Sequence, residues 1–203
     1  MSGQYVAYTF YRIDPAWRRL PIDERAAGKD AFAEVVEDWT GYEDLGELGA
    51  ALNGTPLAAW LETPYSYLAT TKASEYTSAR KARKIVPRES PYLVVYPFVK
   101  VRPWYALPEE ERRRAMDEHI RIGREEFPTI HNHTTYSFGI DDQEFMTAFE
   151  CDEPADFMHL MLRLRDSEAS RYTERDTPIF VGKSVSIRDA LDALDGATSR
   201  VEV

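Results

Sequence analysis

An internal repeat is the feature that most constrains the fold of this chain. The pattern Trp-x-x-Leu-Pro-x-x-Glu-Arg begins at Trp17 and recurs 87 positions later at Trp104. Each copy follows a strand-like run and opens a helical pattern, where proline costs no hydrogen bond and acidic residues face the positive end of the helix dipole. The matched positions behind two similar strands favour duplication of a whole unit over two unrelated proline-initiated helices.

The second half of the sequence predicts the element order β-α-β-β-α-β, which is a ferredoxin-like unit. Strands are expected at 92–101, 130–138, 143–150 and 178–181, and helices at 108–126 and 154–172. The first half predicts a strand at 5–13, helices at 21–39 and 43–61, and a strand at 65–71. Because the two helices follow each other directly, the central hairpin is missing there. The predicted fold class is α+β, with two ferredoxin-like halves of which the first is abbreviated.

The chain is expected to divide into three segments. Residues 1–73 form the abbreviated N-terminal half, 74–90 a basic linker, and 91–203 the C-terminal half that carries the functional site. The linker concentrates positive charge in an acidic chain, with Arg80, Lys81, Arg83, Lys84 and Arg88. Such a run is a solvated connection, or else a lid over an anionic ligand.

Charge and composition exclude several classes of partner. Asp and Glu outnumber Lys and Arg by 35 to 25, and the net charge of −10 disfavours binding to nucleic acid or to anionic lipid. The apolar runs are far shorter than the roughly 20 residues of a membrane helix, and no secretory signal pattern opens the chain. Cys151 is the single cysteine, so no internal disulfide can form and a cytoplasmic location is expected.

His119 has the most informative surroundings of the four histidines. Helical spacing places it on one stripe with Ala115, Met116, Ile122 and Gly123. Small residues one turn before and one turn after it leave the backbone bare enough for a flat ligand to approach. A neutral imidazole on such a face commonly holds haem iron, although a histidine of the core has the same pattern.

The other histidines carry weaker signals. His131 and His133 share one face of a predicted strand, as in some metal sites, but no cysteine or carboxylate at ligand spacing supports such a site. His159 falls at the surface or boundary of an apolar helix.

The strand at 92–101 adds two polar residues. Strand alternation places Tyr96 and Lys100 on the same face, and Pro97 between them suggests an edge or a bulge where a sheet opens onto a site. A buried tyrosine is also an ordinary packing residue whose hydroxyl finds a partner.

Several segments together resemble the family of chlorite dismutases and coproheme decarboxylases. The resemblance covers essentially all of residues 92–182 and extends into the first half through the opening strand. It is carried by the motifs YLVVYPFVK from Tyr92, WYALPEEER from Trp104, EHIRIGR from Glu118, GIDDQEF from Gly139, EASRY from Glu168 and PIFVG from Pro178. The resemblance implies two ferredoxin-like halves in one dimeric α+β barrel unit, usually assembled as a pentameric ring.

The family's functional residues can be carried over by position. The resemblance makes His119 the axial iron ligand and Glu168 the carboxylate that binds its outer nitrogen. It matches Tyr96 to a tyrosine that is oxidised beside a reactive propionate, and Lys100 to a lysine near the same propionate. Two residues are candidates for further propionate contacts on charge pairing as well as on position, namely Arg124 and Arg171.

The resemblance also separates branches of the family. Chlorite dismutases carry a distal arginine where this chain has Asn132, and an amide lacks the cationic fork that would hold a chlorine oxyanion. The expected function is therefore peroxide-dependent decarboxylation of coproheme in haem biosynthesis, with haem b or coproheme as cofactor and hydrogen peroxide as co-substrate. The alternatives are a chlorite-decomposing protein or weak haem peroxidase, and a non-catalytic haem carrier or sensor. A homo-oligomer is expected, with a pentamer favoured.

Overall fold

The structure, a computed structural model, describes residues 3–39, 44–72, 85 and 90–196. The chain divides into two compact units, one made of Met1–Val6 and Tyr67–Ser184 (unit 1) and the other of Ala7–Ser66 and Val185–Val203 (unit 2). Most of the predicted basic linker lies outside the described residues. In the part of the chain that is described, no helix is long and apolar enough to cross a membrane.

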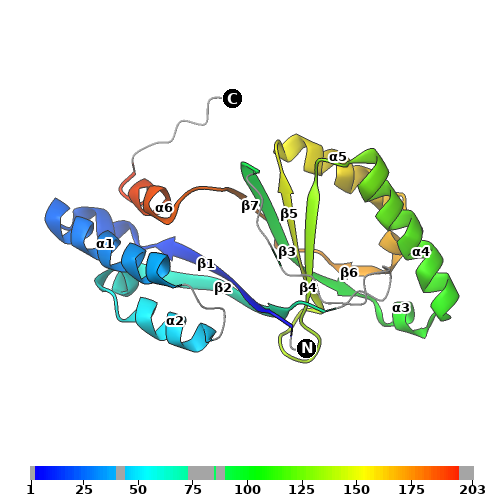
Figure 1. The fold of residues 1–203 in the computed structure, drawn as a ribbon, viewed down its shortest axis with the longest axis horizontal. Helices are drawn as coiled ribbons and strands as arrows, with labels where there is room; N and C mark the ends of the chain where they lie inside the picture. The colour runs from blue at the N-terminus through cyan, green and yellow to red at the C-terminus, as the bar shows by residue number, and fades with distance from the viewer. Residues whose placement is uncertain (1–2, 40–43, 73–84, 86–89, 197–203) are drawn as a thin grey trace. The chain divides into compact units, whose positions relative to one another are not determined.

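Unit 1 contains an antiparallel sheet with helices packed on one of its faces (Figure 1). Its strands are β3 (Tyr92–Lys100), β4 (His131–Tyr136), β5 (Phe145–Cys151), β6 (Thr173–Arg175) and β7 (Phe180–Lys183). β5 pairs with both β3 and β4, and β3 also pairs with β7 and β6. The main helices are α4 (Glu109–Arg121), which follows β3, and α5 (Pro154–Arg165), which follows β5. The predicted ferredoxin-like unit is confirmed.

The strand register decides which side chains share a face of this sheet. Val94 of β3 and Asn132 of β4 both lie opposite Phe149 of β5, so these three side chains share a face. On this face, Tyr96 and Phe149 pack against α5 in the main apolar core of the unit. The side chains at alternate positions of the same strands point to the opposite face.

Unit 2 contains the abbreviated half. Its elements are β1 (Tyr5–Ile13), the 3₁₀ turn η1 (Pro15–Arg19), α1 (Ile22–Asp38), α2 (Leu45–Asn53), the 3₁₀ turn η2 (Pro56–Trp60), β2 (Leu61–Thr70) and α6 (Ile187–Ala193). The first two residues of β1 and the last residues of β2 belong to unit 1, where Thr70 pairs with Tyr136. α1 ends at Asp38 and α2 begins at Leu45, which leaves too short a segment for the two strands of a hairpin. The predicted absence of this hairpin is confirmed.

Two predicted helices are shorter than expected. The helix predicted at 43–61 ends at Asn53 because Pro56 cannot continue the helical hydrogen bonds, and β2 begins directly after the η2 turn. The helix predicted at 154–172 ends at Arg165. Ser167 is fully buried there and donates its hydroxyl to the carbonyl of Leu164, and a separate 3₁₀ turn, η4 (Glu168–Tyr172), follows.

The two copies of the sequence repeat have the same local structure. Trp17 of η1 and Trp104 of the one-turn helix α3 (Arg102–Ala106) are 1% and 3% exposed. The carbonyl of each tryptophan accepts the N–H of the leucine three residues later. Gly28 lies against the ring of Trp17, and Ala115, 87 positions after it, packs with Trp104. The repeat is therefore a helix start anchored by a buried tryptophan.

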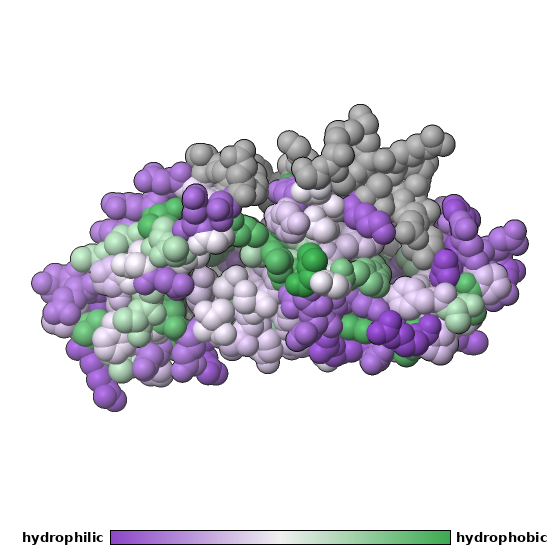
Figure 2. Space-filling model, turned by 90° about the horizontal axis from the view of Figure 1, so that it is seen from below, coloured by the Kyte–Doolittle hydropathy of each residue, from purple (hydrophilic) through white to green (hydrophobic). Residues whose placement is uncertain are grey.

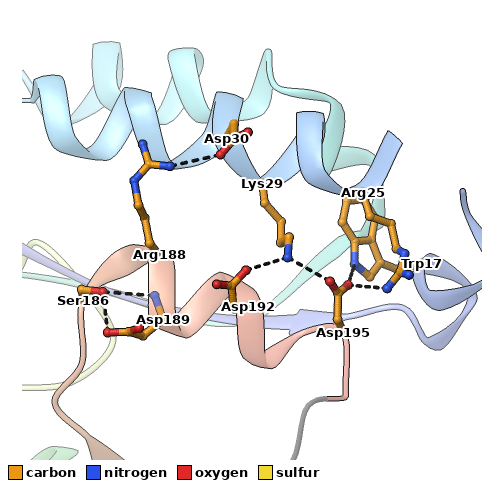
Figure 3. A network of polar contacts seen from close by, with 9 residues as sticks. All are labelled: Trp17, Arg25, Lys29, Asp30, Ser186, Arg188, Asp189, Asp192 and Asp195. Atoms are coloured by element: carbon orange, nitrogen blue, oxygen red, sulfur yellow. Dashed lines mark hydrogen bonds and ion pairs between the residues drawn. The ribbon is translucent and has the colours of Figure 1, made fainter. Parts of the chain in front are cut away.

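The C-terminal helix α6 packs on α1 through a charged cluster (Figure 3). The carboxylate of Asp195 accepts from Trp17 Nε1 at 3.3 Å, from Arg25 Nη1 at 2.6 Å and from Lys29 Nζ at 2.9 Å. Lys29 also binds Asp192 at 2.6 Å. The sequence pattern predicted no helix at these residues, and Val185–Val203 belongs to unit 2.

Exposed apolar side chains are scattered among polar ones. On the face shown in Figure 2, they form small separate groups within a largely hydrophilic surface. The most exposed pair on a long helix is Met158 and Leu162 of α5, at 52% and 61%.

Candidate functional site

The predicted iron ligand, His119, lies in the last turn of α4. The helix predicted at 108–126 is α-helical only to Arg121, and a π-helical turn, Ile122–Glu126, follows directly. Single π-helical turns are rare and occur frequently at functional sites. The sequence pattern gave no sign of this change, because Ile122 and Gly123 continue the apolar stripe of the helix.

One ring nitrogen of His119, Nδ1, is buried. It has no hydrogen-bond partner among the described residues. A buried polar atom without a partner is costly, so an unpaired nitrogen at such a position indicates that something else completes the site.

Electrostatics keep the His119 ring neutral. Burial lowers its pKa, the nearby positive charge of Lys100 lowers it further, and Glu118 opposes both, which leaves the pKa at about 4. At neutral pH the imidazole therefore has a free lone pair, which is the form that binds a metal.

The two small residues beside His119 have different roles. A side chain at Gly123 would meet no atom within 4 Å, so there is open space beside this turn, as predicted. Ala115 is instead buried with Trp104 and Ala169. It also lines a cavity between α4 and η4, so Trp104 covers it on one side only.

Lys100 is almost fully buried near the same helix. It is 7% exposed, and its ammonium group donates to the carbonyl of Ala169 at 2.6 Å. The nitrogen also lies 4.5 Å from the centroid of the Trp104 ring. Burial lowers the pKa of Lys100 to about 8, against the opposing effect of Glu144.

Tyr96 lies in the apolar core between the sheet and α5. Its ring stacks on Phe149 at 6.0 Å and contacts Phe157 at 6.3 Å, and only 4% of the residue is exposed. Its hydroxyl donates to Met161 Sδ at 3.7 Å. Burial raises the pKa of Tyr96 to about 12, so the phenol stays protonated.

The predicted carboxylate partner of His119 has a different contact. The side chain of Glu168 pairs with Arg171 at 3.5 Å, and its backbone N–H donates to Glu118 at 3.1 Å. Glu118 and Glu168 line a cavity of about 330 Å³ between α4 and η4, together with Ala115 and Tyr172. The structure thus brings Glu168 to the helix that carries His119 without joining the two side chains.

The remaining predicted site residues are exposed. Asn132 shares the sheet face of Phe149, and its side-chain oxygen accepts from the Thr134 hydroxyl at 2.8 Å. Arg124 lies on the π-helical turn, and Arg171 lies on η4 beside Glu168. They lie on three different elements of unit 1.

Comparison with known proteins identifies the chain. The profile of the chlorite dismutase family matches residues 29–185, which is most of the sequence. This protein belongs to the chlorite dismutase family. Coproheme decarboxylase from Mycolicibacterium smegmatis is 38% identical over 103 residues, which is 51% of this chain and 44% of that protein. The match thus spans less than half of that relative.

Solved structures of the chlorite dismutase family share the fold. A chlorite dismutase variant from Candidatus Nitrospira defluvii superposes with a TM-score of 0.86 at 22% identity, covering 96% of each chain. A heme-binding protein from Thermus thermophilus superposes with a TM-score of 0.82 at 24% identity, covering 97% of this chain and 96% of that one. At these identities the likeness establishes the fold.

Within this chlorite dismutase family member, the repeat shows how the halves differ. The position of the first half that corresponds to His119, 87 residues earlier, is Phe32. Phe32 is 4% exposed in the core of unit 2, so an apolar ring fills that position.

The other histidines lie away from His119. His133 Nε2 pairs with Glu150 at 2.8 Å, and strand alternation places both His131 and His133 on the face opposite Asn132. His159 is exposed on α5. No group of three or more potential metal ligands occurs among the residues that the structure describes.

Two residues near the site had no predicted role. Glu144 accepts hydrogen bonds from the backbone N–H of Lys100 at 2.8 Å and from the Tyr105 hydroxyl at 2.5 Å, which fixes the end of β3. Its position in the GIDDQEF motif was the only sequence signal. Met161 contacts Tyr96 across the core, and no local pattern predicts a contact between residues so far apart in sequence.

Proposed function

We propose that this protein binds an iron porphyrin through His119 and uses hydrogen peroxide to decarboxylate the propionates of coproheme, which yields haem. The observation that carries the proposal is the neutral imidazole of His119, whose Nδ1 is buried without a partner beside the open space at Gly123. The similarity to a coproheme decarboxylase supports this reaction over the others of the family.

The residues of unit 1 fit an iron porphyrin. Nε2 of His119 would bind the iron, and Nδ1 would then donate its proton to an acceptor, as ligating histidines do. Glu168 would be that acceptor, by turning its exposed carboxylate away from Arg171. Arg124 and Arg171 carry exposed positive charges suited to propionates. The bound iron porphyrin supplies the redox chemistry, with peroxide as electron acceptor.

Tyr96 and Lys100 would act on the substrate. Because the pKa of Tyr96 is about 12, its phenol would lose an electron and a proton together and would then take hydrogen from a propionate. Lys100 would steady the carboxylate. That role requires its ammonium group to leave the carbonyl of Ala169.

The two alternatives lead to different results with the same starting complex. A peroxidase or chlorite-decomposing protein would leave the propionates intact while it consumes its oxidant. A carrier or sensor would hold the porphyrin, leave its propionates intact and consume no oxidant.

A stepwise decarboxylation assay tests the proposal. The protein is loaded with iron coproporphyrin III and given hydrogen peroxide, and the porphyrin mass is followed by chromatography and mass spectrometry. Two losses of carbon dioxide are expected. Tyr96→Phe removes only the hydroxyl, so it should bind coproheme normally but fail to lose the first carbon dioxide. Lys100→Ala should slow this first loss without abolishing it. Conversion at the parental rate in Tyr96→Phe would exclude the decarboxylase and favour a carrier or peroxidase.

We also propose that the protein is a cytoplasmic homo-oligomer, with a pentamer favoured. The lone cysteine supports a reducing compartment. The abbreviated sheet of the first half and the exposed apolar pair on α5 support association between copies.

A further inference from the structure

The contact between Tyr96 and Met161 joins the proposed hydrogen-abstracting residue to an oxidisable one. The Tyr96 hydroxyl donates to the sulfur of Met161 at 3.7 Å. The ring itself is held by Phe149 and Phe157, which keeps the hydroxyl beside the sulfur of Met161. A thioether is a weak acceptor, and it holds the hydroxyl loosely.

Met161 lies at the boundary of the core rather than inside it. Its neighbours on the inner face of α5, Phe157, Leu160 and Leu164, are buried, whereas Met161 is only partly buried against the same cluster. The Met161 side chain is therefore not sealed within the core. Met158, three residues earlier on the same helix, is 52% exposed and provides an internal comparison.

We propose that Met161 is a peroxide-oxidation site whose modification restrains the Tyr96 hydroxyl and slows the reaction. The inference rests on the proposed function, because that function brings hydrogen peroxide to this unit as co-substrate. The sulfur lone pair attacks one oxygen of hydrogen peroxide, and the O–O bond breaks. The departing hydroxide then takes the proton from the oxygen that is now bound to sulfur. The products are one methionine sulfoxide and one water.

The oxidised side chain differs from methionine in what it offers Tyr96. A sulfoxide is polar, and its oxygen is a far stronger hydrogen-bond acceptor than a thioether sulfur. It would hold the phenol proton in place without being basic enough to remove it. Methionine sulfoxide reductases reverse the modification, so the slowed protein can recover.

The test treats the parent, Met161→Leu and Met158→Leu, each loaded with iron coproporphyrin III, with hydrogen peroxide. The peroxide is then removed, and each protein is reloaded with fresh iron coproporphyrin III for the decarboxylation assay. Peptide mass spectrometry should find one added oxygen on Met161. The rates of the parent and of Met158→Leu should fall several-fold relative to their own untreated samples, and methionine sulfoxide reductase should restore them. Met161→Leu should keep its own starting rate. Unmodified Met161 beside oxidised Met158, or equal loss in Met161→Leu, would overturn the proposal.

A second readout does not depend on activity. With tyrosine labelled by carbon-13 at Cζ, the signal of Tyr96 is identified by its absence in Tyr96→Phe. Peroxide should shift this signal in the parent and leave it in place in Met161→Leu. A parent signal that stays unchanged while Met161 is oxidised would refute the coupling. If the protein decarboxylates nothing, the proposed function fails while peptide mass and this signal still decide the modification.

Discussion

The ammonium group of Lys100 lies over the ring of Trp104, with its nitrogen 4.5 Å from the ring centroid. A cation over an indole face is attracted by about 0.5–2 kcal/mol, and more where water is excluded. The backbone carbonyl of Ala169 accepts a second interaction from the same group. Neither neighbour carries a negative charge, so the buried lysine is held in its charged form at an energetic cost.

This cost predicts how stability changes at alkaline pH. The pKa of Lys100 is about 8 in the folded chain and 10.5 ordinarily, so between these values the unfolded chain binds more protons. The free energy of unfolding should therefore rise with pH from 8 toward 10.5, by about 3 kcal/mol in total for this group. Urea titrations of the porphyrin-free protein at pH 7.5 to 10 would measure the rise. Lys100→Met should not show this rise. If the free energy of unfolding rose equally with pH in both proteins, the rise could not come from Lys100.

His119 should govern retention of the iron porphyrin. His119→Ala removes the proposed ligand, so we expect severe loss of bound porphyrin on gel filtration and loss of the histidine-ligated absorption spectrum. His131→Ala and His133→Ala are matched controls, because both side chains lie on the other face of the sheet. Equal losses from all three substitutions would show that the iron is held elsewhere.

Asn132 should leave the protein a poor catalyst of chlorite decomposition. Its neutral amide, already bound to Thr134, cannot supply the fixed cation that would hold a chlorine oxyanion. We expect little or no dioxygen from chlorite in an oxygen-electrode assay of the haem-loaded protein. Sustained, vigorous turnover would show that the cation is dispensable.

Asp195 should stabilise unit 2 through the three side chains that donate hydrogen bonds to its carboxylate. Asp195→Asn weakens its bonds to Arg25 and Lys29, whose side chains are only 15% exposed, and should lower the free energy of unfolding by about 1–3 kcal/mol. Asp192→Asn is the control, because that carboxylate is 72% exposed and should contribute within about 1 kcal/mol. Chemical denaturation of both variants compares them, and equal effects would argue against a special role for Asp195.

The assembly can be measured directly. The first half lacks its central hairpin, and an incomplete sheet leaves edges that favour pairing with another chain. Light scattering at micromolar concentration should give the mass of a homo-oligomer, with five copies favoured. A clean monomer would refute the expectation.

The sequence by itself determined the order of the main strands and helices except β6 and α6, together with the repeat and the abbreviated first half. Alternation and helical spacing repeat over many residues, so they report which side of an element is apolar without knowledge of its partner. For the same reason they placed His119 on a small-residue stripe and Tyr96 on one face with Lys100. The tryptophan anchors of both halves also followed from the local pattern.

Only the tertiary structure decided which partners those faces meet. Tyr96 and Lys100 share a face of β3, yet Tyr96 packs against α5 and Lys100 lies over Trp104, beyond the register shift at Val99/Lys100. The packing of α6 on α1 joins Asp195 to Trp17, 178 positions apart. Contacts between such distant residues depend on how whole surfaces fit together, and no local periodicity encodes that fit.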